Sequence, residues 1–502
     1  MNSGEPEYSQ KNEYVPTSLN RQGKTEDTLA VGLTHMSDEV QEIEQSKGVS
    51  SDAMSLKETF TILRDGVWTE TKLKLITQRA KENPKLKFTS LAYLLNEGFL
   101  EECFKALKKD KACGIDGVTV EEYEADLGEN LRDLIGRMKA LHYYPQAVRR
   151  VNIPKPNGKT RPLGIAAVED KIVQMGIKRI LEAIFEVDFC DSSYGFRPNR
   201  SCHDALDVLG KTIMTKPVNA IVDMDIEQFY DTIDHKWLME CLKQRINDRS
   251  LLRLIVRFLK AGIIEEGKYF EVDKGTVQGN VLSPTLANIY LHFVLNLWFE
   301  RVARKQLRGF AKLTSYADDF VVCFENNESA REFREMLKQR LDKFGLKIAE
   351  DKSRVIEFGR TVWEKARREG RKVATFDFLG FTHFCDKSRK GKFKLGRKTS
   401  SKKFRQKMIV INDWLKKVRN LVRQEEWWKV FRKKIMGHYR YYGICGNIRS
   451  LQRFYHLTSK LAYKWLNRRS QKKSCSYEIY MRYLHITLPR PKIYYTTYAL
   501  SS

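Results

Sequence analysis

Two adjacent aspartates between two apolar segments constrain the fold of this chain more than any other feature. Asp318 and Asp319 follow Tyr-Ala and separate the segments Leu313–Tyr316 and Phe320–Phe324. Like charges at close range repel each other, although a solvated surface turn tolerates them. The flanking residues favour burial, and a hard divalent cation would then relieve the repulsion. The pattern therefore predicts a hairpin that carries two carboxylates at its turn.

A third carboxylate lies in another expected strand. Asp225 is near the end of Ala220–Ile226, and the period of two places Asp223 on the same face. Each feature is weak alone, but together they suggest a two-metal site for phosphoryl transfer, in which ions about 4 Å apart activate a hydroxyl and stabilise the leaving group. No Ser/His/Asp or Cys/His set is evident, which is consistent with metal-assisted chemistry.

The positive charge predicts a polyanionic partner. Lys and Arg number 90 against 63 Asp and Glu, a formal net charge of +27. The excess is concentrated near the C-terminus, because residues 386–502 hold 31 basic and 5 acidic residues, whereas residues 1–55 hold 4 and 10. Nucleic acid is the partner that such a distribution favours, and a merely basic globular protein is the alternative.

The remaining composition indicates a cytoplasmic protein that is not in a membrane. No apolar run approaches the roughly 18 residues of a membrane span. The first residues show neither the basic nor the apolar part of a secretory signal, so we expect none. The nine cysteines include no C-x-x-C pair, which argues against a zinc ribbon and a disulfide framework.

The expected elements indicate an α+β chain that ends in an all-α region. Residues 1–55 are polar and lack an apolar period, which predicts disorder. Strands are expected at Val148–Ile153, Ala220–Ile226, Tyr269–Val272 and in the aspartate hairpin. Helices are expected at Leu91–Leu107, Val168–Val187, Leu238–Ala261, Pro284–Arg304, Ala330–Phe344 (closing at Gly345) and 401–468.

Ordered sequence blocks resemble the reverse transcriptases encoded by bacterial group II introns, also called intron maturases. The resemblance covers roughly residues 88–492, and seven or more blocks in the family's order make chance similarity very improbable. The blocks lie at 111–117, 153–164, 193–201, 225–235, 275–284, 316–319, 376–381, 437–442 and 465–471.

The resemblance implies a set of active-site residues. Asp225, Asp318 and Asp319 match the catalytic metal ligands, and Ile226 would offer its backbone carbonyl. The implied cofactor is a pair of Mg²⁺ ions, for which Mn²⁺ can substitute, while Asp223 is expected to be structural. The residues expected to bind the incoming dNTP are Lys159 and Arg161 at the triphosphate, Tyr230 as the sugar gate, Gln278, and Lys352 near the site. Plain packing for Tyr230 and a surface charge for Lys352 are the alternatives.

The sequence departs from the family pattern at three places, one of which is Ile165-Ala166-Ala167, where a proline is usual. The Gln278 block has Val277 and Asn280 where Pro and Gly are usual. Gly permits backbone conformations that Asn adopts less readily. Glu227-Gln228 replaces a more usual Lys-Gly pair beside Asp225. No metal ligand is lost, so the expected consequence is an altered rate, fidelity or template preference.

Basic and aromatic residues interleave in the C-terminal region, as in the thumb of these maturases. Cations neutralise phosphates and rings stack on bases, although a solvated basic face over an aromatic core is the plain alternative. Trp427 and Trp428 are expected to belong to that core. No His-Asn-His or Cys-pair nuclease segment is present. The residues expected to contact nucleic acid are Arg197, Lys402, Lys403, Arg405, Lys433, Lys434, Arg468 and Arg469.

The implied architecture is a right-hand polymerase with a helical thumb, the maturase X domain. The expected divisions are 1–55 (acidic, disordered), 56–215 (N-terminal extension and fingers), 216–385 (palm), 386–475 (thumb) and 476–502 (tail). The implied partners are group II intron RNA, an RNA template with DNA primer, dNTPs and target DNA. An RNA-binding splicing factor with a vestigial polymerase, or a domesticated reverse transcriptase in DNA repair or phage defence, are the alternative functions.

Overall fold

The computed structural model describes residues 70–108, 112–154, 160–469 and 475–496. They all belong to one compact unit, Ile62–Ser502. The predicted disorder of residues 1–55 and the predicted role of Lys159 fall outside the described residues. The predicted mixture of helices and small antiparallel sheets is confirmed.

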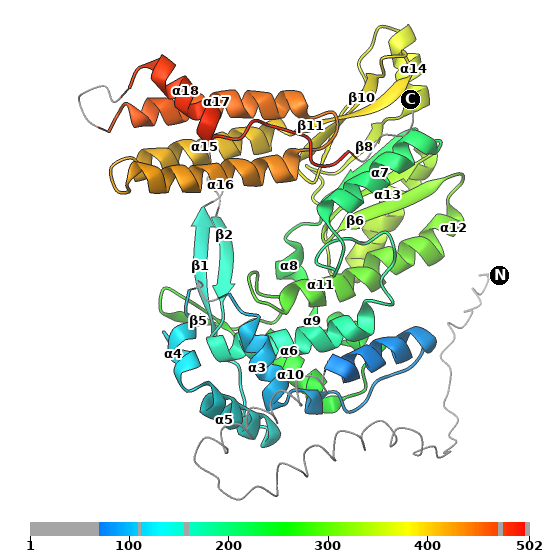
Figure 1. Ribbon diagram of the computed structural model, residues 1–502. Coiled ribbons are helices and arrows are strands. Elements are labelled where there is room, and N and C mark those ends of the chain that lie inside the picture. Colours follow the sequence, from blue (N-terminus) through cyan, green and yellow to red (C-terminus); the bar gives the residue numbers. More distant parts are fainter. Residues whose placement is uncertain (1–69, 109–111, 155–159, 470–474, 497–502) are drawn as a thin grey trace, which may run out of the picture. The chain divides into compact units, whose positions relative to one another are not determined.

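A four-stranded antiparallel sheet, called the central sheet below, carries the aspartates. Its strand order is β6-β7-β3-β8. Both faces are buried, because the adjacent residues Val321 and Val322 belong to two different buried clusters. Helices α13 and α7 contact this sheet (Figure 1). The elements are β3 (Ala220–Met224), β6 (Ala311–Tyr316), β7 (Asp319–Phe324), β8 (Arg354–Glu357), α7 (Cys202–Thr215) and α13 (Asn327–Lys343).

A second sheet contains the predicted triphosphate-binding hairpin, with strand order β2-β1-β4-β5. Strands β1 and β2 pair antiparallel, with Ile153 opposite Arg161. β1 also pairs parallel with β4, which forms a hairpin with β5. This hairpin confirms the strand expected near Tyr269. The strands are β1 (Val148–Pro154), β2 (Thr160–Ile165), β4 (Ile263–Glu265) and β5 (Lys268–Phe270).

Two helices that periodicity predicted as continuous are divided by capping residues. In the first, Asn96 accepts a hydrogen bond from the amide of Phe99 and starts a new helix. In the second, Asp248 accepts from the amides of Ser250 and Leu251. A short polar side chain competes for the backbone in this way, and the apolar period runs on across the break. The resulting elements are η1 (Ala92–Leu94), α3 (Glu97–Lys105), α9 (His235–Lys243) and α10 (Arg249–Leu259).

The other helices of this part follow the apolar pattern. The long segment expected from Pro284 to Arg304 is helical but contains two π-helical stretches, η2 and η3. Residues 70–82 are also helical. The elements are α4 (Val120–Ala125), α5 (Leu127–Lys139), α6 (Val168–Phe185), α8 (Phe229–Thr232), α11 (Ser283–Leu291), η2 (His292–Asn296), η3 (Phe299–Ala303), α12 (Arg304–Gln306) and α14 (Arg360–Arg368).

A third sheet precedes the C-terminal helices. Strands β9 (Phe376–Phe378), β10 (Phe381–Lys387) and β11 (Phe393–Thr399) are antiparallel. The boundary predicted at residue 386 therefore falls inside a hairpin, and the helices begin at Ser401. The sequence concealed this hairpin because Lys and Gly dominate residues 386–398 and hide the strand period.

Three long helices then form the segment called the helical segment below, residues 401–469. They are α15 (Ser401–Val418), α16 (Gln424–Tyr442) and α17 (Ile448–Leu466), which pack on one another (Figure 1). Their core is aromatic and includes Trp427 and Trp428, which are 3% and 5% exposed. The expected tail contributes α18 (Tyr477–Thr487), which joins this core because the Tyr480 hydroxyl donates to the Ser459 carbonyl at 2.7 Å.

No helix in the described part of the chain combines the length and the apolar character that crossing a bilayer requires.

Candidate active site

The three predicted metal ligands meet at one end of the central sheet. β3 pairs with β7 so that Met224 lies opposite Phe320, which places Asp225 beside the turn between β6 and β7. Asp318 and Asp319 occupy that turn, where Ala317 adopts a φ of +54°. The sheet register, set by apolar residues on both faces, therefore brings carboxylates from distant sequence positions together.

A loop from the block at 193–201 supports the aspartate turn. The Tyr194 amide donates to the Ser315 carbonyl at 2.9 Å, and the Ser315 amide donates to Ser192 at 2.8 Å. A Cβ at Gly195 would lie 2.3 Å from the Ala317 nitrogen, so only glycine fits there. This contact explains why the Ser-Tyr-Gly sequence accompanies the aspartate pair: its backbone buttresses the turn.

The carboxylates lie in one another's electric field. Burial, followed by the charges of Asp223 and Asp318, raises the pKa of Asp319 to about 7, although its side chain keeps access to solvent. Burial and the charge of Asp225 likewise raise the pKa of Asp318. Asp223 pairs with Arg354 at 3.6 Å and so has the predicted structural environment. The site therefore carries more negative charge than its protein neighbours neutralise.

Lys352 lies at the site as predicted and binds Asp225. Its Nζ is 2.7 Å from Oδ2 of Asp225, and the side chains are 62% and 39% exposed. The hydrogen bond to Asp225 raises the pKa of Lys352. Among the described residues no three His, Cys, Asp or Glu side chains are already arranged around one point for an ion. Because Asp225 faces Lys352, binding of an ion requires that this exposed pair opens.

The donor set nevertheless fits hard divalent cations. All three side chains offer carboxylate oxygens, which such ions prefer. Burial, and after it the neighbouring carboxylates, raises the pKa of Asp318 and of Asp319, and a cation would favour their ionised forms. Ile226 is buried beside Asp225 and forms an antiparallel bridge with Ile348. Its carbonyl remains a predicted ligand.

Three of the predicted dNTP-binding residues converge on the same place. Nε of Arg161 donates to Oε1 of Gln278 at 2.8 Å, which joins β2 to the 275–280 loop. Tyr230, on α8, joins the same loop, because its carbonyl accepts a hydrogen bond from the Thr276 amide at 2.6 Å. Burial and then the Asp318 charge raise the pKa of its hydroxyl, whereas Arg161 lowers it. Arg161, Gln278 and Tyr230 are thus joined through one loop.

The unusual residues of the Gln278 loop cause no backbone strain. Gly275 and Gly279 adopt positive φ, whereas Asn280 does not. Val277 packs against Gly164, where an added Cβ would lie 2.1 Å from Cγ1 of Val277. Asn280 therefore adds no backbone strain, because the left-handed positions are still glycine. The altered rate, fidelity or template preference stays a prediction. The strained residue is Gln228, at a φ of +45°, where the family usually has Gly.

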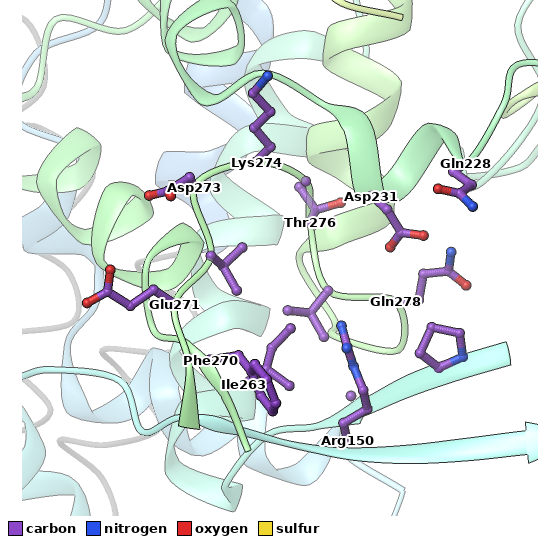
Figure 2. Close-up of a pocket in the computed structure, with 15 residues that line it drawn as sticks. Arg150, Gln228, Asp231, Ile263, Phe270, Glu271, Asp273, Lys274, Thr276 and Gln278 are labelled. Carbon is purple, nitrogen blue, oxygen red and sulfur yellow. The ribbon is translucent and has the colours of Figure 1, made fainter. Parts of the chain in front are cut away.

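A cavity of about 440 Å³ lies beside the Gln278 loop. Glu271, Asp273 and Lys274 lie along one side of it, and Gln228 and Gln278 along the other (Figure 2). Asp225, Asp318 and Asp319 do not line it. The cavity therefore adjoins Gln278 without including the predicted metal ligands.

Arg197 does not belong to the nucleic-acid surface. Its side chain is only 3% exposed, and it pairs with Glu186 at 2.8 Å. The same guanidinium donates to the carbonyls of Cys190 and Ser193, both at 2.9 Å. It therefore holds the loop that supports the aspartate turn, and the prediction that it contacts nucleic acid is corrected.

The predicted RNA-contacting residues of the helical segment lie on its surface to different extents. Five cations of the helical segment lie over aromatic rings, and two of them are predicted contacts: Lys434 over Trp414 at 5.1 Å and Arg468 over Trp465 at 5.8 Å. The exposed residues are Lys402, Lys403, Arg405, Lys433 and Arg468, and the half-buried ones are Lys434 and Arg469.

Sequence reasoning missed the contribution of the turn between β9 and β10. The backbone amide of Leu379 lies within hydrogen-bonding reach of Asp319 and lowers its pKa. The turn lies in the block at 376–381, for which no single residue was given a role. Its Leu-Gly sequence between aromatic residues was the available signal of a tight turn.

Comparison with known proteins gives a class to which this fold is similar. Residues 153–383 match the family described as reverse transcriptase (RNA-dependent DNA polymerase). This part of the chain is therefore similar to reverse transcriptase domains, for which a right-hand polymerase fold and a requirement for divalent metal are general. The resemblance to intron-encoded reverse transcriptases is confirmed by the relatives.

Group II intron-encoded protein LtrA of Lactococcus lactis subsp. cremoris is 40% identical over 233 residues, which are 45% of this chain and 38% of that protein. Protein YkfC of Escherichia coli (strain K12) is 36% identical over 234 residues, 44% of this chain and 60% of that protein. Nuclear intron maturase 1, mitochondrial, of Arabidopsis thaliana is 33% identical over 94 residues, 18% of this chain and 13% of that protein. The match to LtrA thus spans about two fifths of that relative.

Proposed function

We propose that this chain is the RNA-directed DNA polymerase of a group II intron and that it also binds the intron RNA as a splicing maturase. The observation that carries the proposal is the meeting of Asp225, Asp318 and Asp319 at one sheet end, opposite Arg161 and Gln278. A splicing factor alone has no need of this charged arrangement.

The chain's own groups account for the parts of nucleotidyl transfer. Asp225, Asp318 and Asp319, with the carbonyl of Ile226, would hold two divalent ions, Mg²⁺ or in its place Mn²⁺. The bound ions supply activation of the primer 3′-hydroxyl and neutralisation of the charge on the leaving pyrophosphate. The Asp225–Lys352 pair opens for this, and its exposure makes the opening inexpensive.

The nucleotide is oriented by residues opposite the carboxylates. Arg161 would offer a planar, charged set of donors to the triphosphate. Gln278 fixes the orientation of the Arg161 guanidinium through the 2.8 Å hydrogen bond between them. Lys159 would add a second cation. The Tyr230 ring, packed beside Asp318, would exclude a ribose 2′-hydroxyl and so select dNTPs over rNTPs.

The helical segment would hold the nucleic acid. Its exposed cations form a surface on an aromatic core that already holds the helices together, so they are available for phosphates. Intron RNA, the template–primer duplex and target DNA all present the same phosphate chemistry to this surface.

The test is primer extension by purified protein on a defined RNA template with dNTPs and Mg²⁺. The wild type should make full-length cDNA. A protein with Asp318→Ala and Asp319→Ala should lose at least about 1,000-fold in rate, because several kcal/mol of transition-state stabilisation disappear. Folded wild-type protein that binds RNA tightly and yet makes no cDNA, with and without its intron RNA, would contradict the polymerase assignment and leave the splicing role.

A further inference from the structure

The turn between β9 and β10 is strained at the point where it meets the catalytic aspartates. Leu379 has a φ of +47° and Gly380 a φ of +79°. A leucine in the left-handed region costs about 1 to 2 kcal/mol, so neighbouring groups must hold it there. Strand β9, which leads into this turn, contacts β7, which begins at Asp319. The Leu379 amide reaches toward Asp319, so the orientation of this turn bears directly on that carboxylate.

A tyrosine from the helical segment binds the other side of the same residue, through the next peptide group. The hydroxyl of Tyr441, near the end of α16, donates to the Leu379 carbonyl at 2.9 Å. The two residues are 62 positions apart in sequence. Leu379 is thus bound at its carbonyl by the helical segment, while its amide faces Asp319.

Tyr441 is itself held from two other directions. Its ring stacks on Phe381, with centroids 5.9 Å apart and planes at 21°. Its carbonyl accepts a hydrogen bond from Nε2 of His203, on α7, at 2.8 Å. A side chain fixed on its ring and its backbone can transmit the position of α16 to the turn through a single hydroxyl.

A second contact leads from Tyr441 to the aspartate turn. Cys202, the first residue of α7, precedes His203, which binds the Tyr441 carbonyl. Helix α7 also contacts β6. Tyr316 ends β6 and pairs with Asp319 across the hairpin. The two routes, one through Leu379 and one through α7, end on opposite sides of the same turn.

We propose that Tyr441 is a positioning residue, which ties the Leu379–Gly380 turn, and through it Asp319, to helix α16. This inference rests on the proposed polymerase function. It makes the position of the helical segment a determinant of carboxylate geometry: seating of nucleic acid against α16 sets Tyr441, and Tyr441 sets the turn residue whose amide faces Asp319. An ordinary buried hydrogen bond would instead contribute only to stability.

The experiment compares Tyr441→Phe with Tyr439→Phe. Tyr439 lies two residues earlier in α16, and its buried hydroxyl has no hydrogen-bond partner in the described part of the chain, which makes it a matched control. For each protein the measurements are kcat and KM for dNTP at saturating template, affinity for RNA, the melting temperature, and Mn²⁺ binding by electron paramagnetic resonance without substrate.

The expected result is a selective effect on the site. Tyr441→Phe should lower kcat and weaken Mn²⁺ binding by about 5-fold each, the size of one net hydrogen bond, with KM and RNA affinity unchanged. Tyr439→Phe should match the wild type in all measurements.

Two results would overturn the proposal. In the first, Tyr441→Phe equals Tyr439→Phe in kcat and in Mn²⁺ affinity. In the second, the melting temperature and RNA affinity fall while Mn²⁺ binding stays at the wild-type value, which identifies a purely structural bond. If the wild type makes no DNA, the polymerase proposal fails, and the Mn²⁺ comparison still decides the role of Tyr441.

Discussion

The central sheet and the helical segment arrange their charges in opposite ways. The sheet crowds carboxylates onto one turn, where burial and mutual repulsion raise the pKa of Asp319 to about 7. The helical segment spreads cations over an exposed face and rests several on rings, as Arg419 does on Trp465 at 4.8 Å. A crowded site depends on the position of each atom, whereas a spread surface tolerates the loss of any one charge. Substitutions should therefore act very differently in the two regions.

Among variants that leave the aspartates intact, the largest expected effect is on substrate choice, and it belongs to the sheet region. Tyr230→Ala opens the space beside Asp318 that the ring now fills. The preference for dNTP over rNTP should fall by about 100-fold, because a steric barrier is removed. The measurement is kcat/KM for both nucleotides, with Tyr230→Phe as the control that keeps the ring. Unchanged selectivity in Tyr230→Ala would assign the ring to packing alone.

The next effect is on affinity, and it belongs to the helical segment. Reversal of the exposed Lys402, Lys403 and Lys433 to Glu should weaken RNA binding by about 10-fold or more, and reduce the salt dependence by about 0.7 to 0.9 per lost phosphate contact. Substrate choice should stay as in the wild type. The same charge change at the exposed Lys81, Lys85 and Lys87 is the control. Equal losses in both triple variants would show that net charge alone governs binding.

A change of pH should affect the stability of the two regions in opposite directions. Asp319 has a raised folded-state pKa of about 7, so in metal-free protein it removes stability as pH rises from about 4 to 7. His438, in the helical segment, has its pKa lowered to about 3 by burial. With respect to this residue, the folded protein therefore keeps its full stability above about pH 6.5 and loses stability as pH falls below that value.

Denaturant unfolding in EDTA between pH 5 and 8 measures both effects. The free energy of unfolding of Asp319→Asn, relative to wild type, should rise by about 1 kcal/mol between pH 5 and 8. This figure is reduced because the residue is exposed to solvent. His438→Gln should gain about 1 to 2 kcal/mol toward pH 5. Parallel changes in both variants would contradict the opposite placement of charge and burial in the two regions.

The smallest effect concerns Gln228, beside the catalytic Asp225. Gln228→Gly removes a side chain from a left-handed position but adds freedom to the unfolded chain, so the free energy of unfolding should rise by less than about 1 kcal/mol. Asn280→Gly should not stabilise the protein, because Asn280 has no positive φ. A larger gain from Asn280→Gly than from Gln228→Gly would reverse this assignment of strain.

The features that the sequence predicts are those that depend on residues close together in the chain. The aspartate hairpin, its burial and Gly345 as a helix end are local patterns, and all are present. The meeting of Arg161 with Gln278, 117 positions apart, followed only from the family resemblance. Local chemistry thus gave the carboxylates, and order of blocks gave the residues around them.

The features that escaped depend on contacts that sequence spacing does not reveal. Arg197 has the composition of a phosphate ligand, yet its burial against Glu186 becomes apparent only in the fold. The hydrogen bond from Tyr441 to Leu379 joins the helical segment to the turn between β9 and β10. No periodic pattern in the sequence indicates it. The breaks at Asn96 and Asp248 are different, since both residues are strong helix caps and could have been anticipated.

The most direct test of the division between the two regions measures RNA affinity and cDNA synthesis on the same preparations. One variant carries Asp318→Asn and Asp319→Asn, and the other carries the Lys402, Lys403 and Lys433 reversals. The first should retain wild-type RNA affinity and lose DNA synthesis, and the second should lose affinity and recover synthesis at saturating template. Parallel loss of both properties in both variants would contradict the account.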